Sequence, residues 1–253
     1  MKKKWLVVML VSFLSVFVLF GCLPTQSEEE PEEQPEEPVM LKVYLPTTTP
    51  EASPIYLMGS YNVWDITSAA TSEVKVDGDQ KYAEFDISTL FDDEDYPVKY
   101  KYTCDVPWDF VEVNENGGDI KDRRLDVPPE SDVKDVVLNW KGMDPIDYSD
   151  LQKEITVNFV VQVPEGTVDD EGKIYMGGTF TNWAFEPLNK DADTGYYTTE
   201  ATTTSYTAQE YKFLRMDDWS YVEKDAEGGE IQNRMIILTD DATIVNVVGS
   251  WAQ

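Results

Sequence analysis

The sequence predicts an all-β protein built as two tandem immunoglobulin-like β-sandwich modules. Short runs rich in Val, Ile, Tyr, Phe and Thr recur at intervals typical of antiparallel sheets, and the connectors carry Pro, Gly, Asn and Asp. Beyond the N-terminal apolar run, no stretch shows the apolar stripe of an amphipathic helix. The second half of the chain repeats the first, so the predicted strands come in two matching sets.

The repeat is ungapped toward the end of each copy, where residues 98–140 align with 209–251 at an offset of 111. Rare residues coincide, with Trp108 on Trp219. Upstream the offset is 119, because the first copy carries eight extra residues near 91–95, where we predict a surface loop. A duplicated unit of roughly 100 residues is a domain rather than a solenoid repeat.

Each copy is large enough to enclose its own core. We therefore predict module 1 over residues 39–142, a linker over 143–153, and module 2 over 154–253. The predicted strands of module 1 are 41–45, 55–59, 82–87, 98–103 and 136–140, and those of module 2 are 155–163, 173–177, 196–201, 210–215 and 244–251.

The N-terminus has the pattern of an export signal. Three lysines at 2–4 precede an uncharged apolar run over 5–20, which ends at Gly21-Cys22. The Gly-Cys pair resembles the lipobox of bacterial lipoproteins, which implies a signal peptide over 1–21 and lipidation of Cys22. An ordinary signal or an uncleaved anchor remains the alternative, although the run is slightly short for a spanning helix of about 20 residues. Residues 22–38, rich in Pro and Glu, predict a disordered acidic tether.

The chain is strongly acidic and contains no histidine. Its formal charge of −29 becomes −32 without the three signal lysines, which disfavours nucleic acid and anionic lipid surfaces as partners. A neutral or cationic partner is one interpretation of this charge, and plain solubility is the other. Once Cys22 is acylated, Cys104 is the only cysteine left, so no intrachain disulfide is expected.

Three motifs occur in the same order in both copies. They are Gly-x-x-x-x-Trp, then Tyr-Lys-aromatic, then an aspartate-rich turn with a second Trp that leads to Gly-Gly-acid-Ile. In the second copy they read IYMGGTFTNW, EYKFLRMDDW and GGEIQNR. This series resembles the family 48 glycogen-binding and family 20 starch-binding carbohydrate modules over most of 155–251. The first copy, with IYLMGSYNVW, KYKYTCDVPW and GGDIKDR, is a more divergent match over 41–140.

The resemblance implies a binding site in each module, with two tryptophans as a platform for α-glucan rings and Lys and Asn as hydrogen-bonding groups. The first copy has Asp122 at the asparagine position, which replaces an amide by an acceptor-only carboxylate. We therefore expect module 1 to bind more weakly or to prefer other sugars. The implied site residues are Trp183, Lys212, Trp219 and Asn233 in module 2, and Trp64, Lys101 and Trp108 in module 1.

The residue chemistry suits this role, because the C–H face of a pyranose can lie on an indole while its hydroxyls need donors and acceptors. Tryptophans also fill sandwich cores, and we expect that role for Trp140 and Trp251, at the end of an apolar strand. Trp183 and Trp219 follow polar loop residues, which favours exposure. For Trp64 and Trp108, a core position and a surface position are both possible.

The polar residues have alternative roles as well. Lys101 and Lys212 each lie between aromatic residues in a predicted strand and could pair with a neighbouring carboxylate. Asn233 could cap the turn before the next strand.

Catalysis is not expected from this sequence. Without histidine, the His-based triads, Cys-His dyads and common zinc sites are excluded. Acid pairs such as Asp217-Asp218 could suggest glycosidase carboxylates, but adjacent acids are common in so acidic a chain. Residues 191–195 have only the first spacing of a calcium loop, so we predict a solvated turn there, and no cofactor.

The leading hypothesis is a non-catalytic, lipid-anchored protein that binds starch-like or glycogen-like α-glucans in the cell envelope. Leu23, and not an inner-membrane retention aspartate, follows Cys22, which in a bacterium with two membranes favours the outer membrane or cell surface. Its organisation resembles surface lipoproteins that feed an uptake system. A structural or protein-interaction β-sandwich lipoprotein without glycan binding is the alternative, and a targeting subunit for a separate glucan-degrading enzyme is a third.

Overall fold

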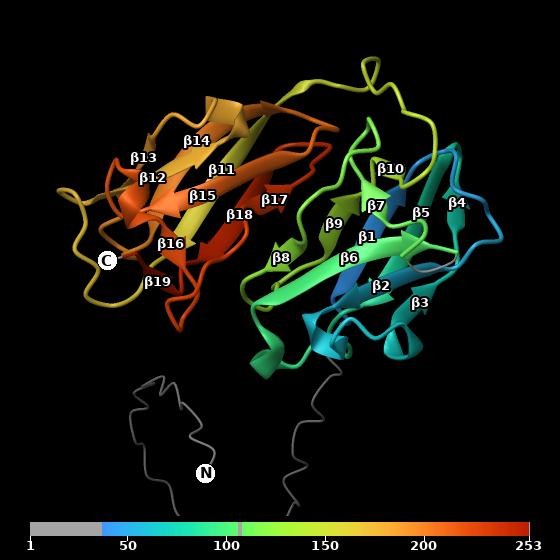
Figure 1. The fold of residues 1–253 in the computed structure, drawn as a ribbon, viewed down its shortest axis with the longest axis horizontal. Helices are drawn as coiled ribbons and strands as arrows, with labels where there is room; N and C mark the ends of the chain where they lie inside the picture. The colour runs from blue at the N-terminus through green and yellow to red at the C-terminus, as the bar shows by residue number, and fades with distance from the viewer. Residues whose placement is uncertain (1–36, 106–107, 253) are drawn as a thin grey trace, which may run out of the picture. The chain divides into compact units, whose positions relative to one another are not determined.

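The computed structural model describes residues 37–105 and 108–252, and nearly all regular structure within them is β-strand (Figure 1). The all-β prediction is confirmed. The predicted signal peptide (1–21), Cys22 and all but the last two residues of the predicted tether (22–38) lie outside the described residues. Within the described part, no helix is long and apolar enough to cross a membrane.

Module 1 is a sandwich of two four-stranded sheets, β4-β5-β1-β9 and β3-β2-β6-β8, with a short β7–β10 pair. Alternation along the strands explains the layering, since Leu41, Val43 and Leu45 are buried while the residues between them are partly exposed. Its elements are β1 (Met40–Leu45), β2 (Ile55–Gly59), η1 (Ser60–Asn62), η2 (Ile66–Ser68), β3 (Ala70–Ser72), β4 (Lys75–Asp77), β5 (Gln80–Asp86), η3 (Asp93–Asp95), β6 (Val98–Cys104), β7 (Glu112–Val113), β8 (Arg123–Leu125), β9 (Val133–Val136) and β10 (Asn139–Trp140).

Module 2 repeats the plan with one difference. A single strand, β13, pairs with both β12 and β14, so its two layers form one seven-stranded sheet, β17-β15-β12-β13-β14-β11-β18. Module 1 has two short strands, β3 and β4, in that part of the chain. The elements of module 2 are β11 (Glu154–Gln162), β12 (Lys173–Gly178), η4 (Thr179–Thr181), β13 (Glu186–Lys190), β14 (Tyr197–Thr204), β15 (Gln209–Leu214), η5 (Trp219–Tyr221), β16 (Glu223–Lys224), β17 (Arg234–Ile236), β18 (Ala242–Val247) and β19 (Ser250–Trp251).

The last strand of each module differs from the sequence prediction. One continuous strand was expected, over 136–140 and over 244–251, but each is divided, into β9 and β10 and into β18 and β19. The chain first pairs parallel with the opening strand of its module, β1 or β11, and then crosses to pair with β7 or β16. The parallel pairs also depart from the antiparallel pattern that was predicted.

The predicted loop near 91–95 is only partly a surface loop. Asp92, Asp93 and Glu94 are exposed, whereas Phe91 is buried with its ring 5.0 Å from that of Tyr61. The extra residues of module 1 therefore add to its core.

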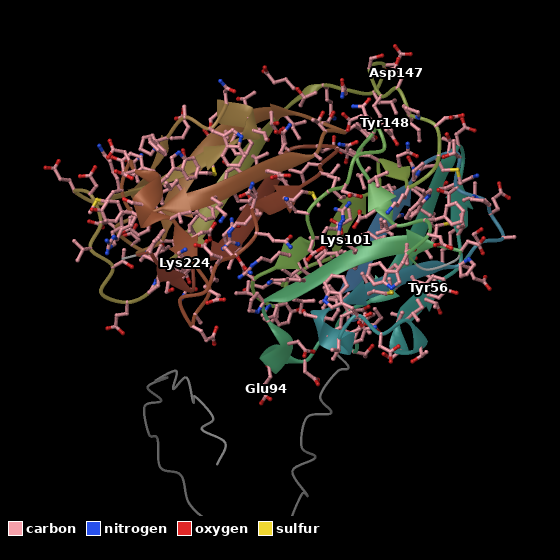
Figure 2. The ribbon with its side chains drawn as sticks, viewed as in Figure 1. Tyr56, Glu94, Lys101, Asp147, Tyr148 and Lys224 are labelled. Atoms are coloured by element: carbon pink, nitrogen blue, oxygen red, sulfur yellow. The ribbon has the colours of Figure 1, made fainter. Side chains whose placement is uncertain are left out.

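The predicted linker over 143–153 packs against both modules through Tyr148. Tyr148, labelled in Figure 2, donates from its hydroxyl to the Leu138 carbonyl oxygen at 2.6 Å. Its ring stacks on that of Tyr206 of module 2, with the ring centroids 5.2 Å apart. Burial raises the pKa of Tyr148 to about 12. Residues 37–253 form one compact unit.

Candidate functional site

In module 2, two loops bring Trp183 and Trp219 together. Their ring centroids are 5.8 Å apart and the rings are tilted by 56°. Trp219 is 42% exposed and Trp183 is partly exposed. Both indoles remain accessible to water, so the pair forms a platform on the surface and is not part of the core.

The turn that carries Trp183 depends on two left-handed residues in succession. Asn182 and Trp183 have φ of 52° and 61°, and the Trp183 amide donates to the Gly178 carbonyl oxygen at 2.7 Å. Asparagine tolerates this conformation better than most residues do. The turn is therefore encoded locally, by the residue just before the tryptophan.

Gly177 of β12 places the platform against the sheet. A Cβ atom there would lie 2.8 Å from Cη2 of Trp219, so the indole covers the glycine directly. Gly177 pairs with Lys212 on the antiparallel strand β15, and paired residues share one face of a sheet. Lys212 therefore stands on the same face as the platform.

Lys212 is anchored to the backbone. Its Nζ donates to the Ile231 carbonyl oxygen at 2.8 Å, and within the described residues it has no carboxylate partner within 4.0 Å. The ion-pair alternative is thus not what the structure has at this position. An ammonium carries three donors, so two N–H groups remain after this bond.

Asn233 lies just before β17 and uses its side chain within the same face. Its Nδ2 donates to Oε2 of Glu210, one strand away, at 2.7 Å. Glu210 and Lys212 alternate with the buried Gln209, Tyr211 and Phe213, so both are on the outer face. The asparagine is therefore held by a cross-strand contact and not by a turn cap.

Module 1 has the same constellation with altered details. The ring centroids of Trp64 and Trp108 are 6.0 Å apart and tilted by 42°, and Trp108 is 43% exposed. The Trp64 amide donates to the Gly59 carbonyl oxygen at 2.9 Å, as at the equivalent turn in module 2. Fully buried Met58 replaces Gly177.

Lys101, which lies on β6 and is labelled in Figure 2, resembles Lys212 of module 2. Unlike Lys212, it has an acidic neighbour. Its Nζ donates to the Ile120 carbonyl oxygen at 2.6 Å and lies 3.9 Å from Oδ1 of Asp122. The ion-pair alternative therefore applies in part here. Asp122 stands at the position of Asn233, so the substitution that the sequence shows has a direct electrostatic consequence for this lysine.

Sequence reasoning missed some aromatic neighbours of the platforms. The Phe185 ring centroid is 5.4 Å from that of Trp219. Tyr175 precedes Gly177 by two positions on β12, which puts it on the platform face, and Tyr56 has the same place on β2 (Figure 2). The signal for the tyrosines was present in the sequence, as the repeated Ile-Tyr that opens the first motif.

The acid-rich segments have structural roles. Asp218 accepts the Ser220 amide at 2.8 Å at the start of η5, and this backbone hydrogen bond lowers the pKa of Asp218. Asp191 accepts from the amides of Asp193 and Thr194 as a turn residue, as predicted. In the part of the chain that the structure describes, no group of three His, Cys, Asp or Glu side chains is arranged to hold a metal ion.

No protein-family model matches the sequence, and no curated protein does. Among solved structures, the fold is similar to CBMbc (family CBM26) of Eubacterium rectale Amy13K in complex with maltoheptaose, at 12% identity and a TM-score of 0.28, over 82% of this chain and 91% of that one. A gamma-CGTase from alkalophilic Bacillus clarkii gives 12% identity and a TM-score of 0.27, over 82% of this chain and 28% of that one.

A third similar structure is the shaft pilin SpaA from Lactobacillus rhamnosus GG, at 11% identity and a TM-score of 0.22, over 83% of this chain and 96% of that one. Scores and identities this low do not assign a function, so the functional argument depends on the site itself.

Proposed function

We propose that this protein binds starch-like or glycogen-like α-glucans, without catalysis, through a tryptophan platform in each module. The observation that carries the proposal is the recurrence of one constellation. Both modules hold two tryptophans with ring centroids 6.0 and 5.8 Å apart, and one indole of each pair is more than two-fifths exposed. A lysine follows on the next strand in both.

The geometry of the rings favours an α-linked chain. Sugar rings stack through their C–H faces on indoles, while Lys and Asn groups beside the platform bind hydroxyls. Because the two indoles are tilted by 42° and 56° rather than coplanar, they match a ligand that curves from one sugar to the next. An α-linked glucan curves in this way, whereas cellulose is flat.

The N-terminal sequence supports the rest of the proposal. Lipidation at Cys22 would anchor the protein in the cell envelope, at the outer membrane or cell surface, with the acidic residues that follow as a spacer. There it would hold α-glucan for an uptake system or a glucan-degrading enzyme.

Affinity electrophoresis tests the binding. Residues 37–253 are run in native gels that contain amylopectin, glycogen, cellulose or no polysaccharide. We expect retardation by the two α-glucans alone, and its reduction in the double variant Trp183→Ala, Trp219→Ala. Tyr196→Ala is the matched control, because Tyr196 is 39% exposed but lies outside the platforms. Equal mobility in every gel would leave the structural or protein-interaction role as the better hypothesis.

A further inference from the structure

The two modules meet along equivalent strands. The edge strand β8 of module 1 lies against the edge strand β17 of module 2, and these strands occupy the same place in the repeat (Figure 1). Buried apolar residues from both modules pack at this junction. They are Ile120, Val136 and Leu138 from module 1 and Met235 and Ile237 from module 2.

A buried carboxylate fixes the junction. Asp126 of module 1, with a side chain only 2% exposed, accepts hydrogen bonds from the Arg234 guanidinium and from the Val247 amide at 2.7 Å, both in module 2. Arg124 of module 1 binds the same carboxylate. A charged contact enclosed in this way has a defined geometry, so the modules are held at one orientation rather than joined loosely.

The two polar positions that the repeat aligns, Asp122 and Asn233, line one cavity at this junction. Its volume is about 20 Å³, enough for roughly one water molecule and too small for a sugar ring. The cavity therefore marks the place where the two candidate binding faces join. Its lining is Lys99, Asp122 and Arg124 from module 1 and Ile231, Gln232, Asn233 and Arg234 from module 2.

The binding groups follow one order across the joined strands. From one platform to the other the strands are β2, β6, β8, β17, β15 and β12. The platforms lie at the outer strands, since Trp219 covers Gly177 of β12 and the Trp64 amide donates to Gly59 at the end of β2. Lys101 and Lys212 lie on β6 and β15, and the aligned polar pair lies at the middle. Four of the five steps join hydrogen-bonded strands about 4.8 Å apart, and the β8–β17 contact between the two sheets is wider, so the outer strands are separated by roughly 25 Å.

We infer that the two platforms act as a single extended site, which takes one α-glucan chain long enough to run across the β8–β17 junction. This inference rests on the proposed function and names its ligand as a long linear stretch of glucan rather than a short oligosaccharide or a chain end. Short ligands fill one platform at a time, whereas a long chain engages both. Because the modules are held rigidly, the second platform binds at high effective concentration.

Titration calorimetry of residues 37–253 with maltotriose, maltoheptaose and a size-fractionated amylodextrin tests this inference. We expect maltotriose to bind weakly with two ligands per protein. The amylodextrin should bind one per protein, with an affinity on the order of 100-fold greater. Light scattering on the same mixture should show one protein per chain, which excludes cross-linking of two proteins by one ligand.

Two variants with a single platform sharpen the result. Trp64→Ala, Trp108→Ala and Trp183→Ala, Trp219→Ala should each lower the amylodextrin affinity to nearly that for maltotriose. If one variant instead keeps the full amylodextrin affinity, or if affinity does not rise with chain length, the extended site is wrong while glucan binding stands. If no ligand binds to the unmodified protein, the proposed function itself is wrong.

Discussion

The two modules neutralise an equivalent buried arginine with different sets of residues. In module 1, Arg123 forms a salt bridge with Glu112 at 2.8 Å and another with Asp135 at 3.2 Å. All three residues belong to module 1, and the side chains of Arg123 and Glu112 are 4% and 0% exposed. Module 1 therefore balances this charge from within its own core.

In module 2, one of the two carboxylates that pair with the equivalent arginine, Arg234, comes from module 1. Arg234 pairs with Glu223 at 2.8 Å, but neutral Asn246 occupies the place that Asp135 has in module 1. Asp126 of module 1 supplies the missing charge. Burial by itself would lower the pKa of Arg234. The carboxylates of Glu223 and Asp126 outweigh this effect, so the pKa lies above its ordinary value. The comparison shows that module 2 depends on module 1 for a charge that module 1 provides for itself.

The largest predicted effect tests this dependence. Asp126→Asn should lower the free energy of unfolding of residues 37–253 by about 3 kcal/mol, because loss of one partner leaves a buried guanidinium undercompensated. Adding Asn246→Asp should restore much of that loss, since it rebuilds within module 2 the arrangement of module 1. Denaturant unfolding of the two single variants and the double variant measures the coupling.

Asp135→Asn is the matched control. It should destabilise the protein by a similar amount, because it removes the equivalent carboxylate from Arg123. Asn246→Asp should not rescue it. If the double variant Asp126→Asn, Asn246→Asp is no more stable than Asp126→Asn alone, a carboxylate at position 246 cannot replace the one at position 126.

The next prediction concerns Gly177, which lies beneath the module 2 platform. Gly177→Ala should displace Trp219, because the new Cβ would lie 2.8 Å from Cη2 of that indole. We expect a loss of about tenfold in maltoheptaose affinity, equivalent to about 1.4 kcal/mol. Calorimetry in the Trp64→Ala, Trp108→Ala background isolates module 2. An unchanged affinity, with unchanged Trp fluorescence, would mean that the indole tolerates the methyl group in place.

The turns that precede Trp64 and Trp183 give a smaller predicted effect, which is on stability. Val63 has φ of 56° and is 85% exposed, whereas Asn182 holds the equivalent position with φ of 52°. A β-branched residue is strained in this region, so Val63→Asn should raise the free energy of unfolding by about 1 kcal/mol. Asn182→Val should lower it by a similar amount. Thermal or denaturant unfolding that changes in neither variant would contradict the assignment of strain.

Much of the fold could be predicted because it depends on local patterns. The buried alternation of Leu41, Val43 and Leu45 and the turn residues around each strand are visible in the sequence. Trp140, predicted to be in the core, is fully buried, and Trp251 packs against the core of module 2. The sequence repeat also predicted which elements of module 2 correspond to which elements of module 1.

The junction could not be predicted, because its partners are far apart in the chain. Asp126 and Arg234 are separated by 108 positions, and the repeat aligns Asp126 with an isoleucine, Ile237. In so acidic a chain, one more aspartate carries no signal. Asn233 was matched to a sugar contact by its motif alone, and only the structure reveals its cross-strand bond to Glu210.

The smallest predicted effect is a difference in acid sensitivity between the platforms. Asp218 accepts the Ser220 amide at the start of the turn that carries Trp219, and this bond lowers the pKa of Asp218. The ionised carboxylate therefore supports the turn at neutral pH, and this support is lost as the pH falls through the lowered pKa. Module 1 has Pro107 at the aligned position, which offers no carboxylate.

Maltoheptaose binding by module 2, measured in the Trp64→Ala, Trp108→Ala background, should thus weaken in the acid range below the ordinary aspartate pKa. Asp218→Asn should flatten that dependence, because the amide oxygen accepts the same hydrogen bond at every pH. Module 1, measured in the Trp183→Ala, Trp219→Ala background, should show less change over the same range. If both platforms weaken together, the acid sensitivity belongs to a feature they share, and the cap at Asp218 is not its cause.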